Sequence, residues 1–136
     1  MNSLNQVSLK GKRVLVRVDF NVPLDDNYTI MDDSRIVAAL PTIKKIIADG
    51  GRAIIMSHLG RPKKGFEKRF SLNNIVGHLS ALLSQNIYFS SDCIGRKTIL
   101  DVNKMNDGDV LVLENLRFYA EEEKGDVGFA NQLANL

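Results

Sequence analysis

Three short apolar runs, each followed at once by polar or cationic residues, restrict the fold of this chain more than any other feature. The runs span residues 13–18, 53–56 and 110–113. Their length and their content of valine, isoleucine and leucine predict buried strands. If the three strands lie parallel in one sheet, the loops that follow them converge at its carboxyl edge, where open α/β sheets bind their ligands.

A first helical pattern separates the first two strands. Ser34 can cap this helix, and the glycines at 50–51 can end it. Its apolar face carries Ile36, Leu40, Ile43 and Ile47. Pro41 lies inside the pattern, so we expect either a kink or a helical first turn that restarts at the proline.

Further elements continue the alternation of strands and helices. Ser71 can cap a second helix, whose apolar stripe is Leu72, Ile75, Val76, Leu79, Leu82 and Leu83. Shorter patterns predict a strand at 87–89, a helix at 93–105, a turn at 106–109 and a last helix through Phe129, Leu133 and Leu136. The whole predicts an α/β fold, a parallel sheet with helices on both faces in a Rossmann-like three-layer α/β/α arrangement.

Composition excludes several classes of function. The 136 residues fit one domain, and the formal net charge of +2 demands no nucleic-acid or membrane partner. No apolar run approaches the ~20 residues that cross a bilayer. The single Cys93 cannot form an internal disulfide, and the first residues lack the basic and apolar segments of a secretory signal. We therefore expect a cytoplasmic protein.

The hexapeptide at 57–62, Ser-His-Leu-Gly-Arg-Pro, is the sharpest single motif. Gly60 allows a tight turn or a close approach to a ligand, and His58 and Arg61 supply nitrogen donors within one short loop. A guanidinium matches two phosphate oxygens at once, so the motif favours phosphate binding. The alternative is a structural loop whose histidine is satisfied by a backbone carbonyl.

Two other strand ends carry groups that suit a small hydroxylated anion. Asp19 and Asn21 follow the first strand, where a carboxylate can accept the proton of a substrate hydroxyl and an amide can donate to its oxygen. Both residues are also common in turns. Glu114 and Arg117 follow the last strand and are similarly ambiguous, because the two side chains can simply pair with each other.

Arg35 stands at a helix start, where the helix dipole disfavours a cation. A bound anion would gain from Arg35 and from the free N–H groups of the same helix start. The alternative is a local ion pair with Asp32 or Asp33.

Other chemistries find little support in the sequence. His58, His78 and Cys93 lack the spacing of metal-ligand motifs, and we interpret His78 as a partly exposed structural residue. Neither a Gly-x-x-x-x-Gly-Lys-Ser/Thr loop nor a Gly-x-Gly-x-x-Gly fingerprint is present. The residues therefore indicate an anion site without an evident nucleotide site.

Four multi-residue motifs resemble those of phosphoglycerate kinase in order and approximate spacing. They lie at 18–23 (Val-Asp-Phe-Asn-Val-Pro), 33–36 through 40–43, 57–62 and 113–118 (Leu-Glu-Asn-Leu-Arg-Phe). The resemblance extends over essentially the whole chain.

That family transfers a phosphoryl group between ATP and 3-phosphoglycerate in glycolysis and its reverse. The resemblance implies an N-terminal domain that holds the glycerate and a C-terminal domain that holds Mg-nucleotide, joined by hinge closure. It implies that Arg35 is the catalytic residue, and that His58, Arg61 and Arg117 grip the 3-phosphate. The substrate-binding residues that it implies are Asp19, Asn21, Arg35, His58, Leu59, Gly60, Arg61 and Arg117.

The resemblance also implies that residues 1–136 are a partial, incomplete N-terminal domain without the nucleotide-binding domain. We therefore expect no cofactor and no metal in this chain, Mg-ATP or Mg-ADP being bound by the absent domain, and no turnover by the chain alone. The resemblance implies a monomeric protein, but a sheet edge left unpaired by a missing strand would favour self-association. The rival interpretation is a nonenzymatic module that binds polyanions through the basic stretch at 61–69.

Overall fold

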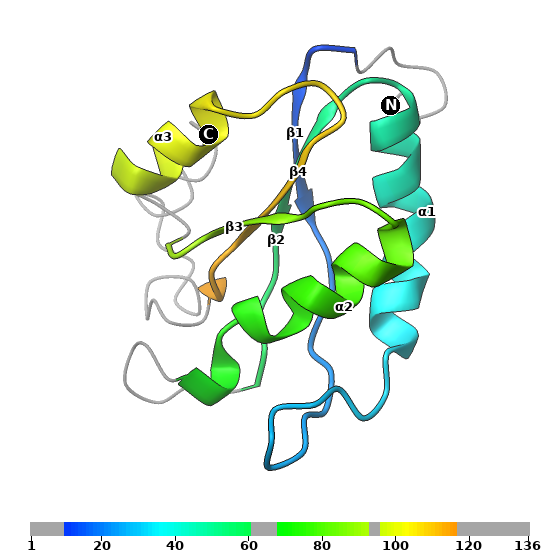
Figure 1. Ribbon diagram of the computed structural model, residues 1–136, viewed down its shortest axis with the longest axis vertical. Helices are drawn as coiled ribbons and strands as arrows, with labels where there is room; N and C mark the ends of the chain where they lie inside the picture. The colour runs from blue at the N-terminus through cyan, green and yellow to red at the C-terminus, as the bar shows by residue number, and fades with distance from the viewer. Residues whose placement is uncertain (1–9, 61–67, 93–95, 117–136) are drawn as a thin grey trace.

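The computed structural model describes residues 10–60, 68–92 and 96–116. In this part of the chain, four strands form one parallel sheet in the order β1-β2-β4-β3 (Figure 1). They are β1 (Arg13–Arg17), β2 (Arg52–Met56), β3 (Tyr88–Ser90) and β4 (Val110–Leu113). The three strands expected from the apolar runs are therefore neighbours, and the prediction that they run parallel is confirmed.

Helices cover both faces of the sheet, as the alternation of strands and helices predicts. Helices α1 (Ser34–Ala48) and α2 (Asn73–Leu83) share a core with β2 and β4 on one face. Helix α3 (Arg96–Asn103) and the residues after it pack on the other face. The first core includes Ile36, Ile43, Ile46, Ile55, Ile75, Leu79 and Val112, and the second includes Ile54, Val102, Met105, Leu111 and Leu113. None of the helices in the described ranges is long and apolar enough to cross a membrane.

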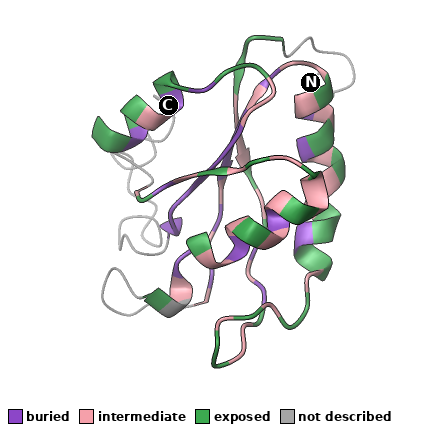
Figure 2. Cartoon of the chain, viewed as in Figure 1, coloured by how far each residue is buried: buried purple, intermediate pink, exposed green. Residues whose placement is uncertain are grey.

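Burial follows position in the sheet (Figure 2). All four residues of β4 are buried, because β4 lies between β2 and β3 and is covered on both faces. The edge strand β1 is exposed at both ends and only half-buried between them. The segment that follows β4 therefore begins in the interior of the molecule, whereas the segment that follows β1 begins near its surface.

Helix α1 runs through Pro41 without ending. Proline deprives the carbonyl four residues earlier, that of Val37, of its helical donor. Both residues are exposed, so water can replace that donor. Of the two expectations for Pro41, a restart of the helix is therefore wrong, because one continuous helix spans Ser34–Ala48.

Helix α1 starts one residue earlier than the sequence suggests, so the expectation that Ser34 is the cap is wrong: the N-cap is Asp33, whose side chain makes no cap hydrogen bond. Ser34 is the first helical residue, and the carboxylate of Asp32 accepts hydrogen bonds from its amide and its hydroxyl. The end follows expectation, because Gly50 adopts a φ of 75° and its amide donates to the Ile47 carbonyl. The next amide, of Gly51, donates to Ile46, which completes a Schellman-type end.

The remaining elements differ from the sequence expectation mainly at their ends. Helix α2 begins at Asn73, whose amide donates to the Ser71 hydroxyl at 3.2 Å, so Ser71 does satisfy one donor of the helix start. The helix expected at 93–105 is described as the shorter α3, with 93–95 outside the described residues. A short 3₁₀ helix, η2 (Lys68–Phe70), precedes α2. The helix expected through Phe129 lies outside the described residues.

Candidate functional site

The loops after β1, β2 and β4 are bound to one another at the carboxyl edge of the sheet. Ser57, which is buried, lies between the other two loops. Its hydroxyl accepts the Phe20 amide at 2.9 Å, and its carbonyl accepts the Leu116 amide at 3.0 Å. Three segments distant in the sequence are thus held together, as the convergence of parallel strand ends predicts.

Asn115 is buried completely and anchors the β2 loop to the segment before α2. Its side-chain amide donates to the Leu59 carbonyl and to the Phe70 carbonyl, each at 2.8 Å. Without Asn115 the buried Leu59 carbonyl would lose its partner in the interior, at a cost of about 1–3 kcal/mol. Asn115 therefore fixes the two backbone positions on either side of residues 60–69.

Glu114 is a nearly buried carboxylate whose partners among the described residues are neutral hydrogen-bond donors. One oxygen accepts a hydrogen bond from the Ser71 hydroxyl at 2.7 Å. The other accepts hydrogen bonds from the backbone amides of Leu72 at 2.9 Å and Asn115 at 2.8 Å. The sequence leaves open a pair between Glu114 and Arg117, but Arg117 lies outside the described residues. What the structure describes for Glu114 is an anchor for the start of α2.

Gly60 occupies a position that no other residue could fill without a rearrangement. Its φ is 62°, and a Cβ built on it would lie 2.3 Å from the ring of Phe70. Its amide donates to the Asn21 side-chain oxygen at 2.7 Å. The prediction of a tight turn is confirmed, and the turn brings the β2 loop against the β1 loop.

Arg35 reaches from the start of α1 to the β1 loop. Its guanidinium donates to the Asn21 carbonyl at 2.9 Å and pairs with the Asp19 carboxylate at 3.3 Å. The alternative of a pair with Asp32 or Asp33 is wrong, because Asp32 binds Ser34 and Asp33 binds His78 at 2.8 Å. The side chain of Arg35 remains about half exposed, at 54%, so the guanidinium is accessible to a ligand.

The carboxyl group of Asp32, two residues before the first residue of α1, is held in its charged form. Hydrogen bonds from the Ser34 hydroxyl and then the Ser34 amide lower the pKa of the Asp32 carboxyl, and the charge of Arg35 adds to the effect. Asp32 is therefore a carboxylate at neutral pH, and it lines the same pocket as Arg35.

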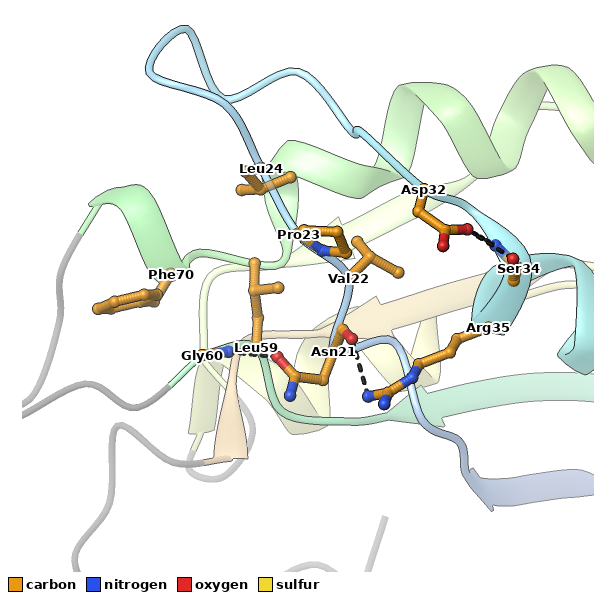
Figure 3. A pocket seen from close by; sticks show the side chains of 10 residues that line it. All are labelled: Asn21, Val22, Pro23, Leu24, Asp32, Ser34, Arg35, Leu59, Gly60 and Phe70. Atoms are coloured by element: carbon orange, nitrogen blue, oxygen red, sulfur yellow. Dashed lines mark hydrogen bonds between the residues drawn. The ribbon is translucent and has the colours of Figure 1, made fainter.

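A pocket of about 540 Å³ opens where these groups meet (Figure 3). Figure 3 shows Arg35 extending from α1 toward Asn21, and Asn21 extending toward Gly60. The residues that line it are Asn21, Val22, Pro23, Leu24, Asp32, Ser34, Arg35, Leu59, Gly60 and Phe70. Its wall combines apolar side chains such as Leu24 and Phe70 with donors from the Asn21 amide and the Arg35 guanidinium. That combination suits a small polar anion with a carbon skeleton.

The residues predicted for the site separate into three groups. Asn21, Arg35, Leu59 and Gly60 line the pocket together, and Asp19 contacts Arg35 beside it. His58 is half-buried on the same loop but is not among the lining residues. Arg61 and Arg117 lie outside the described residues, so their place in the site stays a prediction.

Sequence reasoning missed several residues that shape the pocket. Phe70, Val22, Pro23, Leu24, Asp32 and Ser34 also line it. A weak signal exists for Asp32, because an aspartate two residues before a serine at a helix start often binds that turn. Phe70 carries no such signal, since its place depends on the path of the chain between Gly60 and α2. In the described ranges, no group of three histidine, cysteine or acidic side chains is arranged to hold a metal ion.

Comparison with known proteins identifies one family. The family model for phosphoglycerate kinase matches residues 4–136. The phosphoglycerate kinases of Chlorobium chlorochromatii and Chlorobaculum tepidum are 53% and 54% identical over 134 residues, which is 98% of this chain and 34% of each relative.

Solved structures agree as well. The phosphoglycerate kinase of Pyrococcus horikoshii OT3 superposes with a TM-score of 0.87 at 31% identity, over 99% of this chain and 34% of that one. That of Coxiella burnetii gives 0.84 at 36% identity, over 97% and 32%. This chain spans about a third of the length of the relatives that it matches. The chain therefore belongs to the phosphoglycerate kinase family.

Proposed function

We propose that this chain supplies the 3-phosphoglycerate site of a phosphoglycerate kinase, which transfers a phosphoryl group between ATP and the carboxylate of 3-phosphoglycerate. The observation that carries the proposal is the meeting of Asn21, Arg35, Leu59 and Gly60 in one pocket. These residues come from three separate segments: the loop after β1, the start of α1 and the loop after β2. Membership of the family does not by itself guarantee that the three segments meet in this chain. The pocket is large enough for a three-carbon phosphate ester and offers cationic and amide donors.

The chemistry of the transfer fits the groups that are present. A carboxylate nucleophile is ionised at neutral pH, so the reaction needs alignment and positive charge on the transferring oxygens rather than a base. Arg35 supplies that charge in our proposal, and Asp19 and Asn21 bind the hydroxyl and carboxyl end of the substrate. His58, Arg61 and Arg117 form the phosphate grip in the same proposal.

Nucleotide binding belongs, in this proposal, to a part of the protein outside these 136 residues. The sequence carries no glycine-rich phosphate loop, and the described residues contain no cluster of three histidine, cysteine or acidic side chains arranged to hold a metal ion. Mg-ATP would supply the phosphoryl group from a second domain that closes over the glycerate. We accordingly expect no turnover by this chain with Mg-ATP and 3-phosphoglycerate.

Calorimetric titration of the 136-residue chain with 3-phosphoglycerate tests the proposal. We expect saturable binding that Arg35→Ala weakens by about 10- to 100-fold, the worth of one or two charge-assisted hydrogen bonds. Arg52→Ala is the matched control, since Arg52 is also an arginine in an ion pair, with Asp107 at 3.0 Å, at the opposite edge of the sheet. The control should bind like the unaltered chain.

Two results would contradict the proposal. Absence of binding by the folded, unaltered chain would show that these residues do not form a 3-phosphoglycerate site by themselves. Affinity for nucleic acid that falls steeply with salt and ignores 3-phosphoglycerate would favour the rival polyanion-binding module.

A further inference from the structure

The peptide group between Leu59 and Gly60 is bound on both sides by asparagine side chains. On the buried side, its carbonyl oxygen accepts a hydrogen bond from the amide of Asn115 at 2.8 Å. On the pocket side, its N–H donates to the Asn21 oxygen at 2.7 Å. Because the oxygen and the hydrogen of a trans peptide point in opposite directions, the two asparagines hold one rigid plane between them.

The orientation of both asparagine amides follows from their partners. A carbonyl oxygen only accepts, so the Asn115 atom that faces Leu59 and Phe70 is the nitrogen. A backbone N–H only donates, so the Asn21 atom that faces Gly60 is the oxygen. The nitrogen of the Asn21 amide is then the group left for a ligand, and it has no hydrogen-bond partner in the described part of the chain.

We propose that Asn115 is a positioning residue for the pocket: by holding the Leu59–Gly60 peptide, it determines that Asn21 presents N–H donors rather than an oxygen to the bound anion. The inference rests on the proposed function for the identity of that anion. Asn115 does not line the pocket. It acts through one peptide group and one side chain.

Rotation of this peptide is the alternative that Asn115 prevents. If the plane turned over, the Leu59 carbonyl would face the pocket and the Asn21 amide would have to turn with it to donate to that oxygen. Asn21 would then present its oxygen to the ligand, which repels a carboxylate or a phosphate. The buried position of Asn115, with both donors engaged, makes the observed orientation the stable one.

The hydrogen bonds themselves can be observed by NMR in the unaltered chain without ligand. We expect scalar couplings across two hydrogen bonds, from the Gly60 nitrogen to the side-chain carbonyl carbon of Asn21, and from the side-chain nitrogen of Asn115 to the Leu59 carbonyl carbon. Adding 3-phosphoglycerate should shift the side-chain N–H resonances of Asn21 while the Gly60 coupling persists. Absence of both couplings in the folded chain would overturn the proposal.

A pair of variants separates positioning from general stabilisation. Asn115→Leu keeps the branched shape of the side chain but removes both donors. We expect loss of the Gly60 coupling, altered Asn21 side-chain resonances and at least tenfold weaker binding of 3-phosphoglycerate. Ser71→Ala removes a hydrogen bond to Glu114 from the same buried group of residues without touching the Leu59–Gly60 peptide. It should leave the Gly60 coupling intact and the affinity within about twofold.

The outcomes remain distinct from those of the proposed function. If the unaltered chain shows both couplings but binds no 3-phosphoglycerate, the proposed function is wrong, whereas the two asparagines do hold the Leu59–Gly60 peptide. If a folded Asn115→Leu chain keeps the Asn21 resonances and the affinity, or if Ser71→Ala weakens binding equally, the positioning role is wrong. If Asn115→Leu does not fold, the couplings and the ligand-induced shift of Asn21 in the unaltered chain decide the question.

Discussion

At the amino ends of the strands the chain turns on glycines and backbone hydrogen bonds, whereas at the carboxyl ends it is held by buried side chains. The Gly11 amide donates to Gly50 at 3.0 Å and the Gly108 amide donates to Gly51 at 2.8 Å. The ion pair at this edge, Arg52 with Asp107, is partly exposed. Such an end requires little more than flexible backbone and polar surface.

The carboxyl edge depends on particular side chains instead. Ser57, Glu114 and Asn115 are buried polar residues whose hydrogen bonds join loops from three strands. Buried polar groups cost stability unless their partners are in place, so this edge tolerates few replacements. The same sheet therefore has one end that only closes the fold and one end where buried side chains determine the geometry of the loops.

Replacing one glycine at each edge should give the largest difference in the free energy of unfolding between the two edges. Gly60→Ala would place a Cβ against the Phe70 ring at a φ of 62°, so we expect a loss of about 2–5 kcal/mol in the free energy of unfolding from overpacking and backbone strain together. Gly11→Ala meets no atom within 4 Å at a φ of 72° and should lose only about 1–2 kcal/mol. Urea denaturation of both variants measures the difference, and equal losses would contradict it.

Neutralising an acidic residue at each edge should give a smaller contrast. Glu114→Gln replaces a carboxylate oxygen that accepts the Ser71 hydroxyl by an amide, and we expect a loss of about 1–2 kcal/mol. Asp107→Asn weakens only the partly exposed pair with Arg52 and should change stability by less than about 1 kcal/mol. Thermal and urea unfolding of the two variants test this order. A larger loss for Asp107→Asn would mean that the amino edge is the more specified end.

The smallest expected effect concerns acid stability at the start of α1. Because the folded-state pKa of Asp32 is lowered by its bonds to Ser34, the carboxylate stabilises the fold above the unfolded pKa of about 4, and that contribution is lost as pH falls through the lower folded pKa. Asp32→Asn should therefore flatten the fall in unfolding free energy below about pH 4.

The matched control for that measurement is Asp26→Asn, since Asp26 is exposed and makes no side-chain hydrogen bond with any described residue. Its unfolding free energy should keep the pH dependence of the unaltered chain. If Asp32→Asn leaves the fall in unfolding free energy at acid pH unchanged, the role given to Asp32 is wrong.

The fold could largely be predicted because each element has its own local signal. The apolar runs that became β1, β2 and β4 and the one-face spacing in α1 are both visible without tertiary information. The exact start of α1 could not be assigned, because Asp32, Asp33 and Ser34 are all good capping residues and only the backbone path decides which of them is the N-cap. Pro41 was ambiguous for a similar reason, since its tolerance depends on which side of α1 faces water.

The candidate site was predictable where a residue follows its strand directly, and at Arg35, whose place at a helix start is visible in the sequence. Asn21, Leu59 and Gly60 lie just after β1 and β2, so the parallel sheet places them at one edge. Asn115 has the same position after β4, but the central place of β4 turns it inward to bind Leu59 and Phe70. That outcome depends on the strand order β1-β2-β4-β3, which no local pattern encodes.

Mapping by NMR of 3-phosphoglycerate binding to the isotope-labelled 136-residue chain tests most directly whether the carboxyl edge is the functional end. We predict saturable shifts at Asn21, Arg35 and Gly60 at the carboxyl edge, with Gly11 and Gly108 at the amino edge unchanged. Shifts confined to the amino edge, or no shifts at saturating ligand in a folded chain, would contradict the account.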